Sequence, residues 1–329
     1  MRVFALIAVA LAVVFAAAPA AGPDQNPFVG RWNMTGTGAD STRVYWLELG
    51  ERDGQVTALF LNRGGHPRPP DVLTLDGDEL AWEVHSGNPS NPTIYRFRAH
   101  VQNGRLIGTE QLPPRGRRGG GAATEGRVVN WVGVRPPSWP PANANGDHTY
   151  GEPDVLFDGT SLDAFGVQFA TRELGWTIED GAMANGDGGN NLVSKQTFRN
   201  FKVQAEYRLA EGSNSGIYLR GRYELQVLED HGDAAVDRGH MSIYGRVAPT
   251  VNASKPVGEW QAMEAILVGN RVTVTLNGER VHDNVAIEGI TGGALDANET
   301  EPGPLMIQGD HSGVWIRRIV VTPITAAGR

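Results

Sequence analysis

Five of the Asp-Gly and Asn-Gly pairs in the sequence are flanked by short runs rich in β-branched and aromatic residues. Such a pair supplies the positive φ angles that a tight hairpin turn requires. The pairs fall at residues 53–54, 76–77, 103–104, 180–181 and 277–278. No apolar pattern with the helical period extends over the length of a helix. These features predict an all-β chain built from consecutive hairpins.

Residues 26–136 are predicted to form an up-and-down barrel. Strands are expected at 44–49, 55–60, 72–75, 79–82, 94–101, 105–108 and 128–134. Closing such a meander into a barrel removes its exposed edges. The Gly30-Arg31-Trp32 opening and the closing Arg135 resemble the corresponding positions of lipocalin-like barrels. We therefore expect a lipocalin-like β-barrel domain here.

A proline-rich stretch, residues 137–153, interrupts the strand pattern and is expected to be a semi-rigid extended linker. Strands resume in residues 154–325, where we expect them at 176–179, 182–183, 201–209, 216–219, 223–228, 260–268, 271–276, 279–281, 305–308 and 314–322. So many strands with long intervening loops indicate two packed antiparallel sheets. The sequence thus predicts a barrel domain followed by a β-sandwich domain.

The N-terminus has the pattern of a signal peptide over residues 1–21. Arg2 precedes an apolar run from Val3 to Ala18, and Ala18-Pro19-Ala20 offers small residues for cleavage. The run is too short and too rich in alanine for a bilayer span. We expect a periplasmic or secreted protein. It contains no cysteine, so it must be stabilised by core burial rather than by disulfides.

The formal charge of −8 argues against nucleic acid or an anionic membrane as the main partner, because both require a basic face. A neutral carbohydrate is compatible with this charge. The charge therefore argues against a polyanionic ligand and leaves a neutral one open.

The second domain carries a series of motifs in a distinctive order. They are Leu156-Phe157-Asp158-Gly159-Thr160-Ser161-Leu162, Glu179-Asp180-Gly181, Asn214-Ser215-Gly216-Ile217-Tyr218-Leu219-Arg220, Tyr223-Glu224-Leu225-Gln226-Val227-Leu228-Glu229-Asp230, Gly258-Glu259-Trp260, Gly303-Pro304, and Gln308 with His311. This order resembles the 3-keto-disaccharide hydrolase domain over essentially the whole second domain. The chain departs from the family pattern at Gln261, where Asn is usual, and at Arg317-Arg318, where Arg-Asn is usual.

The resemblance implies a concanavalin-like jelly roll that cleaves glycosides already oxidised at C3, by hydrolysis or by elimination. It also leaves open a functional pairing with a sugar 3-oxidoreductase that supplies the ketone. A C3 ketone acidifies the hydrogen on C2, and loss of that proton lets the group on C1 depart. Such a site needs a base near C2, donors near the C3 oxygen and an acid near the departing oxygen.

Strand period selects the first candidates. Glu224 and Gln226 alternate onto one face of the strand at 223–228, and a bulge at its end could turn Glu229 onto the same face. We predict that Glu224 and Glu229 are catalytic and that Gln226 binds substrate. The alternative is a solvated outer face carrying ordinary charges.

Further candidates come from the other motifs. His311 is suited to proton exchange near neutral pH, and the resemblance groups it with Gln308. Lys255 could act as base or electrophile, with a solvent-facing loop cation as the alternative. Candidate substrate-binding residues, besides Gln226 and Gln308, are Asn214, Arg220 and Trp260. A turn cap, a salt bridge and a core position, respectively, are the structural alternatives for these three.

The sequence indicates no cofactor that is required, and it leaves a divalent cation open. No cysteine or paired-histidine motif indicates structural zinc. Two groups could supply oxygen ligands to a divalent cation, namely Asp187, Asn190 and Asn191 in a glycine-rich loop, and Glu229 and Asp230 beside His231.

Two rival functions remain open. The segment from Glu224 to Glu229 copies the Glu-x-Asp-x-x-Glu signature of retaining laminarinase-type glycosidases, except that Gln226 replaces the central Asp. A non-catalytic lectin or carbohydrate-binding module is the other rival, because fold does not dictate function. Convergence of proton-transfer groups on one pocket would argue against a lectin.

Overall fold

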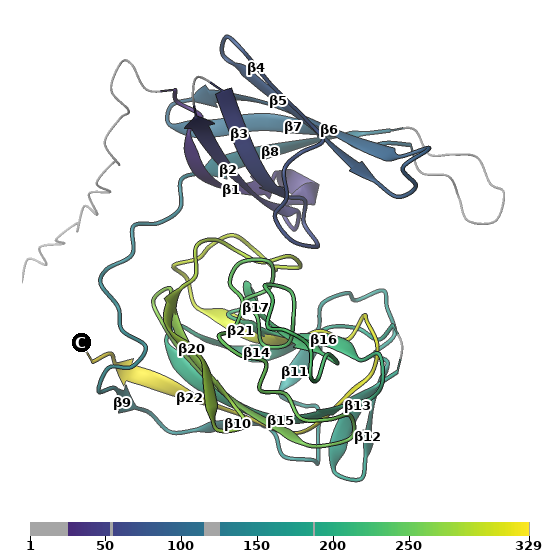
Figure 1. Ribbon diagram of the computed structural model, residues 1–329, viewed down its shortest axis with the longest axis vertical. Coiled ribbons are helices and arrows are strands. Elements are labelled where there is room, and N and C mark those ends of the chain that lie inside the picture. Colours follow the sequence, from purple (N-terminus) through teal and green to yellow (C-terminus); the bar gives the residue numbers. More distant parts are fainter. Residues whose placement is uncertain (1–25, 53–54, 115–125, 187, 329) are drawn as a thin grey trace, which may run out of the picture.

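The computed structural model describes residues 26–52, 55–114, 126–186 and 188–328. The predicted leader at residues 1–21 lies outside this part of the chain. The described chain is almost entirely β, with one short 3₁₀ turn, η1, at Gly38–Asp40. None of its helices has the length and apolar character needed to cross a bilayer. The prediction of an all-β fold with a barrel and a sandwich is confirmed (Figure 1).

The first eight strands form one antiparallel sheet that curls into a nearly closed barrel. They are β1 (Gly30–Gly36), β2 (Val44–Arg52), β3 (Gln55–Leu61), β4 (Val72–Asp76), β5 (Glu79–Ser86), β6 (Thr93–Gln102), β7 (Arg105–Gln111) and β8 (Val128–Val134). Their order is β3-β2-β1-β8-β7-β6-β5-β4, so the first and last strands pair, as expected for an up-and-down barrel. Among the described residues, a single isolated bridge, Phe60 to Arg68, joins the β3 side to the segment before β4.

Aromatic side chains fill the barrel. Trp82 stacks on Phe97 with ring centroids 5.0 Å apart, and Phe60 meets both rings edge-on. Because successive strand residues point in opposite directions, core residues occupy every second position of a strand, as Leu80, Trp82 and Val84 do on β5. Aromatic contacts of this kind stabilise a core beyond simple area burial.

Arg135 closes the end of the barrel where the first strand begins. Its guanidinium lies 3.6 Å from the centroid of the Trp32 ring and donates hydrogen bonds to the carbonyl oxygens of Val29 and Pro27. The Gly30 backbone has φ of 106°, and a Cβ there would crowd the same guanidinium. These contacts give the Gly-x-Trp opening and the closing Arg a common physical role.

The remaining strands form a two-sheet sandwich. The larger sheet has the order β12-β13-β22-β15-β18-β19-β20, with β9 and β10 also paired to β22, and the smaller sheet has the order β11-β14-β21-β16-β17. The strands are β9 (Thr149–Tyr150), β10 (Asp154–Phe157), β11 (Phe165–Val167), β12 (Trp176–Glu179), β13 (Ala182–Asn185), β14 (Leu192–Phe198), β15 (Phe201–Leu209), β16 (Asn214–Leu219), β17 (Tyr223–Leu228), β18 (Gln261–Val268), β19 (Arg271–Leu276), β20 (Glu279–Ala286), β21 (Gly303–Ile307) and β22 (Val314–Ala326). Aliphatic and aromatic side chains from both sheets form one core between them.

The segment between the two domains is docked on the sandwich. The backbone N–H of Ala144 donates to Asn284, and the Asn145 side chain bonds to Asp283 and Thr273. β9 then pairs with the end of β22. The extended connection is therefore held against the larger sheet (Figure 1).

We expect Arg135→Ala to lower the free energy of unfolding by about 1–2 kcal/mol, because it removes a cation–π contact and two charged hydrogen bonds. Urea denaturation of the full chain followed by tryptophan fluorescence measures this change. Arg98→Ala, which removes only an exposed ion pair with Glu79, is the control and should change stability less. An equal loss in both variants would contradict the role assigned to Arg135.

Candidate active site

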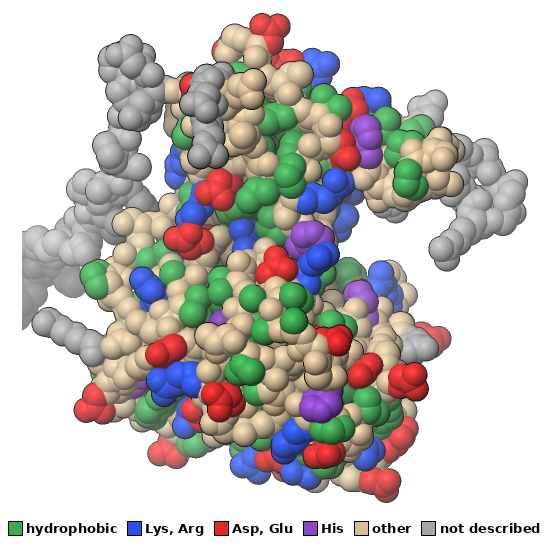
Figure 2. All heavy atoms as spheres, viewed as in Figure 1, with side chains coloured by type: hydrophobic (Ala, Val, Ile, Leu, Met, Phe, Trp, Pro, Cys, Tyr) green, Lys and Arg blue, Asp and Glu red, His purple; other side chains and the backbone are tan. Residues whose placement is uncertain are grey.

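A cavity of about 990 Å³ lies between the barrel and the smaller sheet of the sandwich. On the sandwich side, its wall is built by the hairpin β16–β17 and by the loops around 167–169, 292–295 and 308–311. On the barrel side, its wall includes parts of β2, β5, β6 and β7. The space-filling view shows the hollow between the two halves of the molecule (Figure 2).

Glu224 is the most deeply buried acid of the sandwich wall. It lies on β17, where Tyr223, Leu225 and Val227 point into the sandwich core and Glu224 and Gln226 point the other way, toward the cavity. Only 3% of Glu224 is exposed to solvent. The predicted placement of Glu224 and Gln226 on a shared face therefore matches the structure.

The neighbouring strand makes room for this carboxyl group. Gly216 on β16 lies beside Glu224, and a Cβ at Gly216 would collide with Glu224 Oε1. Tyr218 is paired with Glu224 across the hairpin, and its hydroxyl also donates to the carbonyl oxygen of Gly292 at 2.9 Å. The glycine of the Asn-Ser-Gly motif is thus required to accommodate the acid.

Burial raises the pKa of Glu224 to about 8. Loss of hydration is the largest cause, and the negative charge of Asp310 adds to it, whereas a hydrogen bond with Tyr218 opposes it. At neutral pH the side chain is therefore a carboxylic acid that carries a proton, as proton donors in catalytic sites often do.

Amide side chains surround this acid. The Gln226 amide lies 3.2 Å from the Asn214 side-chain oxygen and 3.3 Å from Glu224 Oε1. Gln308 also lines the cavity, and its backbone is fixed by Gly216 and Ser215, with the Gln308 N–H donating to the Gly216 carbonyl at 2.9 Å. These amides can donate to or accept from sugar hydroxyl and carbonyl groups.

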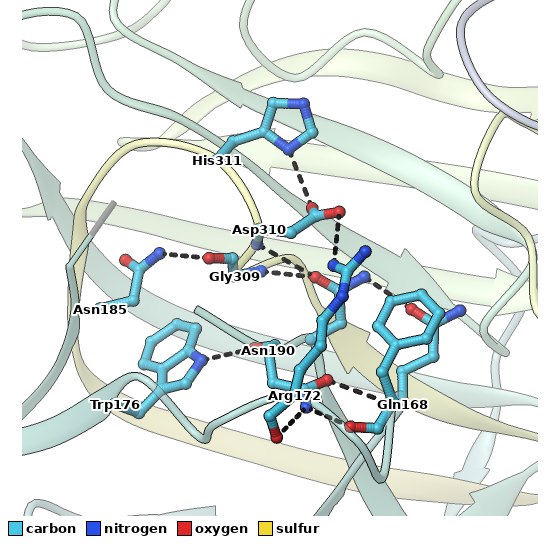
Figure 3. Close-up of polar contacts among 10 residues, drawn as sticks. Gln168, Arg172, Trp176, Asn185, Asn190, Gly309, Asp310 and His311 are labelled. Carbon is cyan, nitrogen blue, oxygen red and sulfur yellow. Dashed lines mark hydrogen bonds and ion pairs between the residues drawn. The ribbon is translucent and has the colours of Figure 1, made fainter. Parts of the chain in front are cut away.

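His311 and Asp310 form a hydrogen-bonded pair on the loop before β22. His311 Nδ1 lies 2.9 Å from Asp310 Oδ1, and Arg172 approaches the other oxygen at 3.8 Å (Figure 3). Asp310 raises the pKa of His311 through this hydrogen bond, and His311 in turn lowers the pKa of Asp310. With Nδ1–H directed at the carboxylate, Nε2 is left to accept a proton.

A network of asparagines holds this loop in place. Asn191 Oδ1 accepts hydrogen bonds from the backbone N–H groups of Gly309 and Asp310, and Asn185 donates to the Gly309 carbonyl at 3.0 Å. The Trp176 indole donates to the Asn190 carbonyl at 2.7 Å (Figure 3). The position of the His-Asp pair is therefore fixed by buried polar contacts.

Four of the predicted site residues lie outside the cavity. Glu229 follows the end of β17 and accepts from the Gly212 N–H at 3.4 Å. Lys255 donates to the Trp260 carbonyl, and the Trp260 ring lies against the guanidinium groups of Arg208 and Arg317. The expected bulge does not bring Glu229 onto the face of Glu224, and Trp260 precedes β18, which belongs to the other sheet.

Arg220, the fourth, lies in the turn between β16 and β17 with φ of 54°. Its guanidinium is 1% exposed and donates to the carbonyl oxygens of Glu299 and Gly269, beneath the interdomain segment. The structure thus brings together Glu224, Gln226, Asn214, Gln308 and His311, and leaves Glu229, Lys255, Trp260 and Arg220 elsewhere.

Sequence reasoning missed several residues of the cavity wall. Two of them could have been predicted. Asp310 directly precedes His311 in the sequence, and Tyr218 lies opposite Glu224 in the predicted hairpin. The wall contributed by the barrel had no signal in the sequence, because it depends on how the two domains pack.

No group of three or more His, Cys, Asp or Glu side chains suited to a metal ion occurs in residues 26–52, 55–114, 126–186 and 188–328. Of the ligands considered from sequence, Asp187 lies outside these residues. Asn190 bonds to the backbone of Phe169, and Asp230 accepts from His240 N–H and Asn252. In Asn190 and Asp230, these contacts therefore use side-chain oxygens that were considered as cation ligands.

Glu224→Gln tests the burial of the acid through stability. In the wild type, the folded pKa of about 8 exceeds the unfolded value near 4.5, so the folded state binds the extra proton between these values. Stability from this group is full below about pH 4.5 and is lost as the pH rises through 8. The melting temperature of Glu224→Gln relative to wild type should therefore rise from pH 5 to pH 9, measured by calorimetry.

Glu229→Gln is the matched control, since Glu229 lies at the end of the same strand and outside the cavity. Its difference from wild type should stay small at each pH. A difference between Glu224→Gln and wild type that does not change with pH would show that Glu224 is not buried as a neutral acid.

The comparisons with known proteins concern the second domain. Residues 152–322, more than half of the chain, match the model of the 3-keto-alpha-glucoside-1,2-lyase-like domain. A 3-keto-disaccharide hydrolase of Bacteroides thetaiotaomicron is 28% identical over 163 aligned residues, covering 39% of this chain and 56% of that protein. The chain therefore spans little more than half the length of this curated relative.

Solved structures resemble the chain more loosely. A protein described as a glycosyl hydrolase from Parabacteroides distasonis has 26% identity and a TM-score of 0.47, covering 57% of this chain and 92% of its own. The endo-β-1,3(4)-glucanase SCLam has 10% identity and a TM-score of 0.35, and the match covers 58% of this chain and 94% of that protein. On the family match over 152–322, the chain belongs to the family of 3-keto-alpha-glucoside-1,2-lyase-like domains, the 3-keto-disaccharide hydrolase family expected from its motifs.

Proposed function

We propose that this protein cleaves glycosides whose sugar ring carries a ketone at C3, by elimination across C1 and C2. Addition of water to the product converts the same reaction into net hydrolysis. Membership of the family supports this substrate class. The observation that carries the proposal is that a neutral, buried carboxylic acid and an aspartate-paired imidazole line one cavity.

His311 is the base in this reaction. Its Nδ1–H is directed at Asp310, so Nε2 takes the proton from C2 of the sugar. The electron pair of the C2–H bond forms the C1–C2 double bond through the enolate of the C3 ketone. Asp310 stabilises the imidazolium that results and orients the ring.

Glu224 is the acid. It holds its proton at neutral pH because its pKa is raised to about 8, and it gives this proton to the glycosidic oxygen as the C1–O bond breaks. The amides of Asn214, Gln226 and Gln308 bind the C3 oxygen and the neighbouring hydroxyl groups. Each of the three chemical requirements is thus met by a group on the cavity wall.

The geometry of the cavity supports the mechanism of a retaining glycosidase less well than it supports elimination. That mechanism needs two carboxyl groups about 5 to 5.5 Å apart across the scissile bond. Glu229 lies outside the cavity, and Gln226 stands where the central carboxylate of the signature would be. A lectin, in turn, gains nothing from a neutral buried acid beside a polarised histidine.

The proposed substrate must be made by a prior oxidation of the C3 hydroxyl. A sugar 3-oxidoreductase is the class of enzyme that supplies it. The leader pattern of residues 1–21 supports a periplasmic or secreted location for the reaction.

Matched substrates test the activity. We expect purified protein to release methanol from methyl 3-keto-glucoside and to leave methyl glucoside intact. Glu224→Gln should lower kcat/KM for the keto compound by about 10²- to 10⁴-fold, as should His311→Ala, because each removes a proton-transfer group. Glu229→Gln is the control and should retain wild-type turnover. Equal turnover of the unoxidised glucoside would support the glycosidase, and binding without turnover of either would support the lectin.

Asp310→Asn tests the roles of the two titrating groups. The base must be neutral and the acid protonated, so kcat/KM should rise through the pKa of His311 and fall through that of Glu224. Asp310 raises both pKa values. Both limbs of the pH profile should therefore move to lower pH in the variant, in steady-state rates measured from pH 5 to 10. Movement of either limb to higher pH would contradict the assignment.

A further inference from the structure

The barrel contributes one whole wall of the cavity that holds Glu224. This part of the chain lies outside the family match at residues 152–322. Side chains from the ends of β5, β6 and β7 face the hollow, among them Ser86, Tyr95 and Glu110. The end of the barrel that meets the sandwich is therefore a polar surface opposite the proposed catalytic groups.

Glu110 is the unusual residue of this surface. It is 1% exposed, and its Oε2 accepts hydrogen bonds from the Tyr45 hydroxyl at 2.5 Å and from Arg43 at 3.1 Å. Its Oε1, although buried, has no hydrogen-bond partner among the described residues. A buried oxygen without a partner costs free energy, which a donor brought by a ligand can offset.

The barrel is fixed in place over the sandwich. Arg246 from the sandwich lies 3.9 Å from the centroid of the Trp46 ring on β2, and the backbones of Gly65 and Gly292 approach so closely that a Cβ on Gly292 would collide with Gly65. The Gly293 N–H donates to the Arg63 carbonyl at 2.7 Å, at the edge of the cavity. The distance between the two walls is therefore held by direct contacts.

A buried acid ties this interface to the strand that carries Glu224. Glu299, 2% exposed, accepts from the Asn33 amide of the barrel at 2.7 Å and from the Tyr223 hydroxyl at 2.8 Å. Tyr223 is adjacent to Glu224 on β17. The barrel and the proposed acid thus share one rigid support.

We propose that the mouth of the barrel, formed by Glu110, Arg43, Tyr95 and Ser86, binds the leaving group of the substrate, and that this leaving group is a hydroxyl-rich unit such as a second sugar. This inference rests on the proposed function. A hydroxyl of the leaving group donates to Glu110 Oε1, and the keto ring lies against Asn214, Gln226 and Glu224 on the opposite wall. The barrel thereby selects glycosides with a polar leaving group.

The test compares two substrates that share the keto ring and differ in the leaving group. One is a 3-keto disaccharide of two glucose units, and the other is methyl 3-keto-glucoside. In Glu110→Gln, we expect the ratio of kcat/KM for the disaccharide to that for the methyl compound to fall about tenfold or more, because the amide cannot reproduce the carboxylate acceptor while bonded to Tyr45 and Arg43. Glu79→Gln, on the outer surface of the barrel, is the control and should keep the wild-type ratio.

A second variant avoids the interior of the barrel. Ser86→Trp introduces a ring at an exposed strand end in the cavity wall and should also lower the ratio, by blocking the space for a large leaving group. Unchanged ratios in both Glu110→Gln and Ser86→Trp, or equal losses on both substrates, would overturn the proposal.

Binding of glucose separates this inference from the proposed reaction. Calorimetry with glucose as the mimic of the leaving group should show weaker binding to Glu110→Gln than to wild type and to Glu79→Gln. This result does not depend on turnover. If the wild type cleaves neither keto compound but glucose binding depends on Glu110, the proposed function is wrong and the barrel subsite is supported. If glucose binds equally well to wild type and Glu110→Gln, the subsite alone is wrong.

Discussion

The burial of one carboxyl group, that of Glu224, is the constraint on which the arrangement of this molecule depends. Burial of an acid that is 3% exposed favours its neutral form and hydrogen-bond partners for its oxygens. Gly216 provides the space, Tyr218 provides a hydrogen bond, and Gln226 lies within 3.3 Å of Oε1. One face of the hairpin β16–β17 therefore accommodates the buried acid, and the opposite face packs in the sandwich core.

The barrel forms the wall of the cavity opposite Glu224. The contacts that hold it there include those of Trp46 with Arg246 and of Asn33 with Glu299, and Glu299 also accepts from Tyr223 on β17 itself. The packing of the two domains and the position of the strand that carries the acid are therefore linked.

Local sequence patterns predicted the elements that local physics determines. The turns at Asn103-Gly104 and Asn277-Gly278, and the strands 128–134, 201–209 and 223–228, appear where the sequence placed them. Strands β10, β11 and β14 were not expected, because they are short or carry polar residues and depend on pairing with distant strands such as β21 and β22.

The same distinction applies to the site. The alternation of Glu224 and Gln226 follows from the period of a strand, so it was predictable. Whether Glu229 turns with them depends on a bulge at the strand end, and the structure has none in the β16–β17 register. Trp260 was placed by its motif, but the direction of its side chain depends on which sheet β18 joins. Long-range pairing decides such cases.

In the proposed reaction, the two-walled cavity also orders the events. Water attacks C1 only after the leaving group has vacated the barrel mouth, since the keto ring and its leaving group together span the space between the walls. Elimination needs no water, because His311 takes the C2 proton and Glu224 supplies one to the departing oxygen. This division of roles therefore favours elimination first and hydration second. On this argument, the barrel influences the chemical outcome as well as the choice of substrate.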